Sequence, residues 1–392
     1  KVLAQINEDE VVAFLRKIVQ TPTVNPPGDV RAAIQICADT LDAVGFRTRT
    51  VSLVPTKPNL LAELGQEGPT LCFNAHLDVV PTGERSAWKH DPFGADVADG
   101  RVYGRGAGDD KASVTAQVMA GVAVARSGIP LRGTLVVNEV ADEEIGGPNG
   151  AALVVNEGHV KPDFVIVGEQ TMNRVCIGEK GAAATRVTVT GKAAHGALPW
   201  EGANAIEAMA AIIHALRTEL FPQLAKRTHP LFHPSSASVN MMTGGVKENV
   251  VPDLCSVYID RRVVPGEDPK ECVAEIKAVA EQAIADFPGV TVDVQPATQG
   301  RPAILADPAS PLVQGMTAAN RYLGLNPEPS GFSMATDGRF FVAAGYPTII
   351  YGPGDPKIAH IADEWVGIDE VMEATRAYAL AAVALIGAQG ND

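Results

Sequence analysis

The sequence predicts an α/β fold in which a three-layer α/β/α domain is interrupted by an inserted ferredoxin-like domain of βαββαβ order. Towards both ends of the chain, apolar strand-like runs alternate with helix-like segments, which is typical of a largely parallel sheet covered on both faces. The middle of the chain instead follows the order strand, helix, strand, strand, helix, strand. A length of 392 residues also favours roughly two domains.

The first part of the three-layer domain is expected to span residues 1–180, and it alternates helices with strands. The predicted helices are 7–20, 30–46 and the long segment 111–128. The first begins at a capping Asn7, and the second is closed by Gly45. The predicted strands are 47–54, 59–65, 69–80, 133–144 and 162–170.

The inserted domain is expected to span 181–298, and the second part of the three-layer domain 299–392. Within the insertion, the predicted strands are 182–193, 236–245, 253–263 and 290–298, and the helices are 204–220 and 269–287. After it, a helix at 310–324, a strand at 346–354 and a helix at 370–388 return to the earlier alternation.

The composition excludes several function classes. A formal net charge of −14 without any Lys/Arg run argues against nucleic-acid binding, which needs a clustered basic surface. Since no apolar run approaches the ~20 residues of a membrane span, no membrane association is expected. The five cysteines are odd in number and form no C-x-x-C pair, so we expect buried thiols in a reducing, cytoplasmic compartment.

Polar residues that suit metal binding follow the predicted strands, at the edge of the sheet where ligands bind in parallel α/β folds. Each has an ordinary explanation when taken alone, such as a helix cap or a solvated turn. Taken together, two imidazoles and three carboxylates suit a pair of zinc ions or a similar divalent metal. The proposed ligands are His76, Asp109, Glu144, Glu169 and His360.

Two further carboxylates accompany these ligands. Asp78 follows His76 by two residues, so we expect both side chains on one face and a hydrogen bond from the imidazole to the Asp78 carboxylate. Glu143 precedes the proposed ligand Glu144, and a hydrolytic metal site needs such a free carboxylate as general base.

Nine motifs carry a resemblance to a known family. They are HLDVVP, GRGAGDDK, ADEE, VGE, GKAAHGALPWEGANAI, NVVP, DRRVVPGE, TDGRFF and YGPGD…AH. In this order they resemble the zinc metallopeptidases that include acetylornithine deacetylase, succinyl-diaminopimelate desuccinylase, aminoacylase and the glutamate carboxypeptidases. The resemblance extends from about residue 8 to about residue 385.

The resemblance implies a role for each metal ligand. His76 and Glu169 would bind one metal, Glu144 and His360 the other, and Asp109 would bridge them. The metals would be two Zn²⁺, with Co²⁺ or Mn²⁺ as alternatives. The peptide bond after the bridging aspartate is often cis in this family.

The resemblance also implies roles for residues outside the metal set. His195 would stabilise the oxyanion, and in dimeric relatives this histidine comes from the partner subunit. Asn249, Arg262 and Arg339 match positions that contact the substrate, often its carboxylate. The inserted domain would then act as a lid and as the contact of a homodimer.

These features predict a di-metal amidohydrolase that cleaves the amide bond of a small N-acyl-L-amino acid. A dipeptidase or carboxypeptidase of the same family is the first alternative, because both cut an amide near a carboxylate. A non-catalytic relative is disfavoured because the ligands and the base are all present. A nucleotide-binding protein is rejected because GRGAGDDK lacks the spacing of a phosphate-binding loop. The segment GALPW after His195 departs from the small polar residues of many relatives, which leaves the substrate open.

Overall fold

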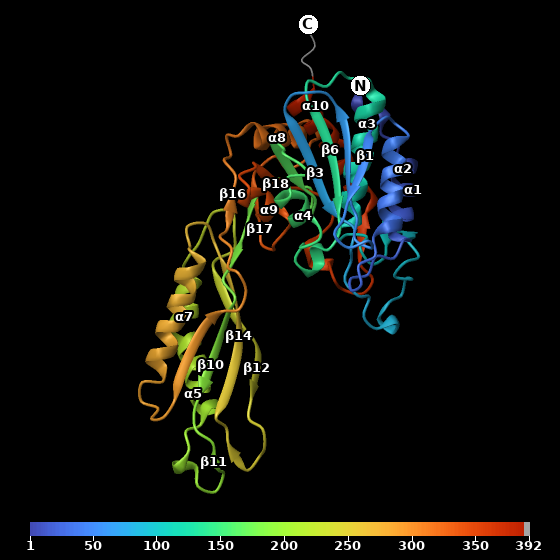
Figure 1. Ribbon diagram of the computed structural model, residues 1–392. Coiled ribbons are helices and arrows are strands. Elements are labelled where there is room, and N and C mark those ends of the chain that lie inside the picture. The colour runs from blue at the N-terminus through green and yellow to red at the C-terminus, as the bar shows by residue number, and fades with distance from the viewer. Residues whose placement is uncertain (388–392) are drawn as a thin grey trace. The chain divides into compact units, whose positions relative to one another are not determined.

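The computed structural model describes residues 1–387 and divides into two compact units (Figure 1). Unit 1 combines Lys1–Gly178 with Ala306–Asp392, and unit 2 is Glu179–Leu305. The predicted insertion, 181–298, is shorter than unit 2 at both ends, because the segments that lead into and out of unit 2 carry no periodic apolar pattern. Residue 388, the last of the predicted C-terminal helix, lies outside the described residues.

A mixed β-sheet forms the centre of unit 1. In sheet order its strands are β1 (Arg47–Val51), β2 (Asn59–Gly65), β6 (Thr134–Val140), β3 (Thr70–His76), β7 (Phe164–Val167), β18 (Thr348–Ile350) and β8 (Cys176–Glu179), and β17 (Ser330–Phe332) pairs with β8. The central strands β6, β3, β7 and β18 are parallel to one another, whereas β1, β2 and β8 pair antiparallel with their neighbours. The sheet is therefore less uniformly parallel than predicted, because a short connection joins β1 to β2 where a parallel pair needs a long crossover.

Helices cover both faces of this sheet, which confirms the predicted α/β class. They are α1 (Glu8–Val19), α2 (Arg31–Asp42), α3 (Lys111–Ser127), α4 (Ala151–Asn156), α8 (Pro311–Leu323), α9 (Gly338–Ala343) and α10 (Ile368–Ile386). On β3, Cys72 belongs to the apolar cluster that includes Val154 of α4 and Phe341 of α9. The next residue, Phe73, points to the opposite face, where its ring packs 4.9 Å from that of Tyr378 on α10.

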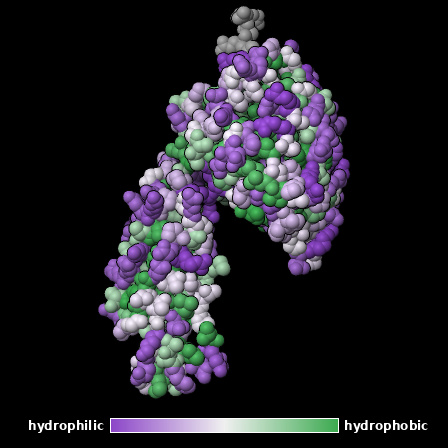
Figure 2. Space-filling model, viewed as in Figure 1, coloured by the Kyte–Doolittle hydropathy of each residue, from purple (hydrophilic) through white to green (hydrophobic). Residues whose placement is uncertain are grey.

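Several short elements of unit 1 escape prediction because they are too short to show periodicity. A three-stranded sheet pairs β19 (Trp365–Gly367), β5 (Arg101–Tyr103) and β4 (Asp96–Ala98). Short helical turns occur at η1 (Val2–Gln5), η2 (Arg85–Ala87), η3 (Glu143–Ile145) and η6 (Pro356–Ile358). On the face shown in Figure 2, hydrophilic residues cover most of unit 1 and hydrophobic residues occur in small groups.

Unit 2 has the strand and helix order predicted for a ferredoxin-like module. The antiparallel sheet follows the order β12 (Ser236–Gly244), β14 (Leu254–Val263), β10 (Thr185–Thr190) and β15 (Thr291–Pro296). Its helices are α5 (Ala205–Ala215), which continues through the π-helical turn η5 (Leu216–Leu220) into α6 (Phe221–Leu224), and α7 (Pro269–Ala283). The remaining short elements are β9 (Gly181–Ala182), β11 (Ala194–His195), η4 (Pro199–Glu201), β13 (Val250–Val251) and β16 (Ile304–Leu305).

The helices of unit 2 pack on one face of its sheet. Ile212 of α5 and Ile276 of α7 share a buried apolar cluster with Val187 of β10 and Val257 of β14. All five cysteines are free and buried, as expected from their apolar surroundings. Among the described residues, no helix has the length and apolar character needed to cross a membrane.

Candidate metal centre

Three parallel strands of unit 1 end at the same edge of the sheet. His76 is the last residue of β3 and lies opposite Val140, the last residue of β6. Asn74 of β3 lies opposite Val167, with which β7 ends. The segments that follow these strands carry the acidic residues, so the parallel register itself places them beside His76.

Asp109 lies between the two proposed histidine ligands. Its Oδ1 atom is 3.1 Å from Nε2 of His76, and its Oδ2 atom is 3.0 Å from Nε2 of His360. His360 Nε2 is also 3.2 Å from Oε2 of Glu144. Ligand atoms of His76, Asp109 and Glu144 all lie within 4.8 Å of one another. A carboxylate that faces an imidazole with each oxygen is suited to bridge two cations.

The charges of these groups compensate one another. Hydrogen bonds to Asp109 and Glu144 raise the pKa of His360 to about 10. Burial acts to lower the pKa of His76, but the carboxylates of Asp109, Asp110 and Glu143 together outweigh burial and raise it well above its usual value. While no cation is bound, the neighbouring carboxylates therefore favour the protonated form of both imidazoles, and metal binding would displace those protons.

Burial has the largest effect on the pKa of the other acids near Asp109. Burial raises the pKa of Glu169 well above its ordinary value, and nearby Asp109 and Asp110 add to this effect. Burial likewise raises the pKa of Glu143 and of Glu144. Within residues 1–387, the buried Oε1 atom of Glu144 has no hydrogen-bonding partner. A divalent cation would stabilise the charged form of these carboxylates, so the nitrogen and oxygen donors present fit a metal pair.

The turn that carries Glu143 and Glu144 is held by Asp78. Its carboxylate accepts hydrogen bonds from the backbone N–H groups of Glu143 (3.1 Å) and Glu144 (3.3 Å), and from Nδ2 of Asn25 (2.8 Å). His76 Nδ1 instead contacts the backbone carbonyl oxygen of Asp78 at 3.0 Å, whereas the nearest carboxylate oxygen is 3.7 Å away. The predicted hydrogen bond to the Asp78 carboxylate was therefore wrong, because β3 ends at His76 and the strand alternation does not extend to Asp78.

A second carboxylate, Asp142, completes this turn, and the sequence did not reveal its partners. Asp142 has a left-handed backbone (φ 74°), and its side chain contacts Lys57 Nζ, Asn25 Nδ2 (3.1 Å) and Asn149 Nδ2 (2.7 Å). Asn25 and Lys57 belong to loops distant in sequence and carry no motif, so only the folded chain relates them to the metal centre.

The carboxylate of Asp78 should matter through the turn that it holds. Asp78→Asn replaces an acceptor oxygen with a donor NH₂ group that faces backbone N–H groups, so we expect the zinc affinity to fall roughly 10- to 100-fold. A competition titration of the metal-free protein with zinc measures this effect. Asp29→Asn is a suitable control because it alters an exposed carboxylate that contacts Arg31. Equal zinc affinities of Asp78→Asn and the parent protein would contradict the expectation.

The remaining site residues lie in both units. In unit 1, Arg339 belongs to α9, its guanidinium lies 4.6 Å over the Phe340 ring, and its charge acts to lower the pKa of Glu143. In unit 2, His195 of β11 pairs with Val250, and the next residue donates its backbone N–H to the Asn249 carbonyl oxygen at 2.8 Å.

Arg262, the third predicted substrate contact, lies on β14 of unit 2. Its Nε and Nη2 atoms donate to the two oxygens of Asp260 at 2.8 and 3.1 Å. A substrate carboxylate would therefore share this guanidinium with Asp260. In unit 1, the Asp109–Asp110 peptide bond is cis, as the family resemblance implied.

The chain is similar in sequence to a family of peptidases and to a desuccinylase. A family model described as peptidase family M20/M25/M40 matches residues 72–384. A succinyl-diaminopimelate desuccinylase of Methylobacterium radiotolerans is 30% identical over 383 residues, which cover 94% of this chain and 95% of that protein.

Solved structures share the fold. A tripeptidase from Staphylococcus aureus superposes with a TM-score of 0.79 at 21% identity and covers 97% of this chain and 99% of its own. A Bacillus subtilis protein described as a dinuclear metal-binding peptidase has a TM-score of 0.70 at 16% identity, with 96% of this chain and 98% of that chain covered.

Proposed function

Because the chain belongs to peptidase family M20/M25/M40, we propose that it is a di-metal amidohydrolase that cleaves the amide bond of an N-acyl-L-amino acid. Family membership makes it a metal-dependent hydrolase of amide or peptide bonds. The finer proposal is supported above all by Asp109, whose two oxygens each face a histidine at 3.1 and 3.0 Å, next to the Glu143 turn.

The proposed ligand set divides between two metals. His76 and Glu169 would hold one ion, Glu144 and His360 would hold the other, and Asp109 would be shared by both. We propose zinc, with cobalt or manganese as alternatives, because imidazole and carboxylate ligands suit all three. When bound, such ions would supply a Lewis acid for the substrate carbonyl and would lower the pKa of the attacking water.

The protein's own residues carry the proton transfers. Glu143 accepts the proton of the attacking water on its carboxylate and later delivers it to the leaving nitrogen. Its raised pKa, caused mainly by burial, suits a group that must both take and return a proton. His195 donates a hydrogen bond to the oxyanion. Asn249, Arg262 and Arg339 contact the substrate, and the two arginines are the candidates for binding its carboxylate.

Metal removal and a substrate panel test this proposal. The purified protein should hydrolyse N-acyl amino acids, lose this activity to a chelator and regain it with zinc. A protein that contains no divalent metal and whose hydrolysis a chelator leaves unchanged would refute the proposal. A panel that compares N-acyl amino acids with dipeptides separates the proposal from its first alternative. Preferential cleavage of dipeptides would select that alternative, a dipeptidase or carboxypeptidase.

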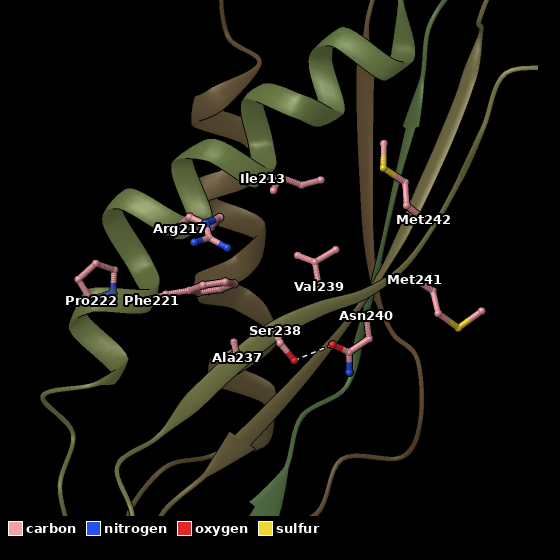
Figure 3. Close-up of a pocket in the computed structure, with 10 residues that line it drawn as sticks. All are labelled: Ile213, Arg217, Phe221, Pro222, Ala237, Ser238, Val239, Asn240, Met241 and Met242. Atoms are coloured by element: carbon pink, nitrogen blue, oxygen red, sulfur yellow. Dashed lines mark hydrogen bonds between the residues drawn. The ribbon is translucent and has the colours of Figure 1, made fainter. Parts of the chain in front are cut away.

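We also propose a homodimer formed through unit 2 in the cytoplasm, a compartment that suits five free buried cysteines. β12 ends the strand order of its sheet, so its outer edge has no strand partner in the described chain. Beside this edge lies a groove of about 600 Å³ between β12 and the α5–α6 segment, lined by Ile213, Phe221, Val239 and Met241 among others (Figure 3). An edge strand of this kind can pair with a second copy.

A mixture of two inactive variants tests both the dimer and the role of His195. His195→Ala should lower the turnover roughly 100- to 1,000-fold, as expected for loss of one oxyanion donor. After subunit exchange with an equal amount of Glu143→Ala, about half of the dimers should be hybrids, and each hybrid has one intact site of two. The mixture should therefore recover roughly a quarter of the parent activity. No recovery in a mixture that demonstrably contains hybrid dimers would refute the cross-subunit role.

A further inference from the structure

A buried ion pair, Arg105 with Glu364, contacts the backbone of two proposed metal ligands and has no part in the proton transfers above. The two residues are 259 positions apart in sequence, and their side chains are 2% and 0% exposed. Glu364 uses Oε2 to accept a hydrogen bond from Nη1 of Arg105. Each partner then has a second set of contacts.

The second carboxylate oxygen of Glu364 holds the backbone at Asp109, the proposed bridging ligand. Oε1 accepts hydrogen bonds from the N–H groups of Gly108 and Asp109, both at 3.0 Å. These bonds fix the peptide that precedes the Asp109 side chain, and therefore the direction in which its two oxygens face the histidines. Charged acceptors form stronger hydrogen bonds than neutral ones, which favours a carboxylate at this position.

Arg105 holds the backbone of the other ligand loop. Its Nη2 atom donates to the carbonyl oxygens of His360 (3.3 Å) and Pro81 (3.4 Å). His360 has a left-handed backbone (φ 66°), which is uncommon for a residue other than glycine and must be held by surrounding contacts. The guanidinium also lies 5.2 Å over the ring of Trp88, which limits its freedom to move.

We propose that Arg105 and Glu364 are positioning residues that set the spacing between Asp109 and His360 and thereby the affinity for the metal pair. This inference rests on the ligand set of the proposed function. Hydrogen-bonding partners that orient metal ligands typically change metal affinity roughly 10- to 100-fold when they are altered. If the pair only stabilised the fold, altering it would lower the stability of the metal-free protein and leave the zinc affinity of the folded protein unchanged.

Two variants of the full chain separate these possibilities. Glu364→Gln keeps the side-chain size but loses the charge and one acceptor oxygen. Arg105→Lys keeps the charge but offers a single nitrogen, which cannot reproduce the planar fork that reaches both Glu364 and the His360 carbonyl. For each we would measure zinc affinity by competition with a chromogenic chelator, and unfolding of the metal-free protein. We expect a roughly 10- to 100-fold loss of zinc affinity in both.

Glu275→Gln in unit 2 is the matched control. It disrupts another ion pair, in which Oε2 of Glu275, whose side chain is 35% exposed, lies 2.7 Å from Nη1 of the fully buried Arg261. This control should lower the unfolding midpoint and leave zinc affinity unchanged. If Glu364→Gln does not fold, Arg105→Lys carries the test. A folded variant that binds zinc as tightly as the parent would overturn the positioning role, whereas a parent that binds no zinc would refute the proposed metal set itself.

Discussion

Glu143→Gln should lower kcat roughly 100- to 10,000-fold, the range that general acid–base catalysis usually contributes. The amide of glutamine fills the same space as the carboxylate but cannot accept the proton of the attacking water or return it to the leaving nitrogen. Because Glu143 is not a proposed metal ligand, the variant should still bind two zinc ions with near-parent affinity. Steady-state kinetics and metal analysis of the same preparation measure both properties.

Glu157→Gln provides a matched control for this loss. Glu157 follows α4 in unit 1, is exposed, and lies outside the proposed catalytic set. Its replacement makes the same chemical change and should leave kcat within about twofold, as is usual for surface positions. If Glu143→Gln folds, retains its metals and turns over near the parent rate, Glu143 is not the base, and another group must take the proton.

The sequence was most informative where local pattern and topology act together. An apolar run that ends in His76, or in the acidic run at residues 142–144, predicts a strand with a polar end, and parallel strands bring such ends to one edge. The glycines of GRGAG mark a sharp turn before α3, which places Asp109 at that same edge. These inferences need only short stretches of chain and a single rule about sheets.

The position of His360 beside Asp109 could not be derived from local sequence pattern. As a lone histidine in a loop it has no periodic context, and its place beside Asp109 depends on contacts between segments more than 250 residues apart. The backbone hydrogen bonds of Asp78 and Glu364 are equally hidden, because any acid can accept an N–H and no spacing rule identifies which. Such contacts are properties of the folded chain, and they are the contacts that hold the ligands in place.

Asp109→Asn should also cause a large loss, of both bound zinc and turnover, because this single side chain serves both proposed metals. Asparagine keeps one oxygen, but its NH₂ group cannot bind a cation and would face one of the two histidines. We expect the loss of at least one zinc equivalent and a fall in turnover on the order of 1,000-fold, comparable to the removal of a strong electrostatic contribution to catalysis. Metal analysis after dialysis, with kinetics at added zinc, measures the two effects.

The comparison with Asp96→Asn makes this result specific. Asp96 also contacts a histidine, His90, at 3.0 Å, but its side chain is 52% exposed on the small sheet of unit 1. Its replacement should change neither zinc content nor turnover, because Asp96 lies outside the proposed metal ligands, and it should alter stability little because the carboxylate is exposed. If Asp109→Asn kept two zinc ions and parent turnover, the bridging role would be wrong. If it lost one ion and kept turnover, the chemistry would need only the remaining ion, and the two-metal proposal would give way to a one-metal mechanism.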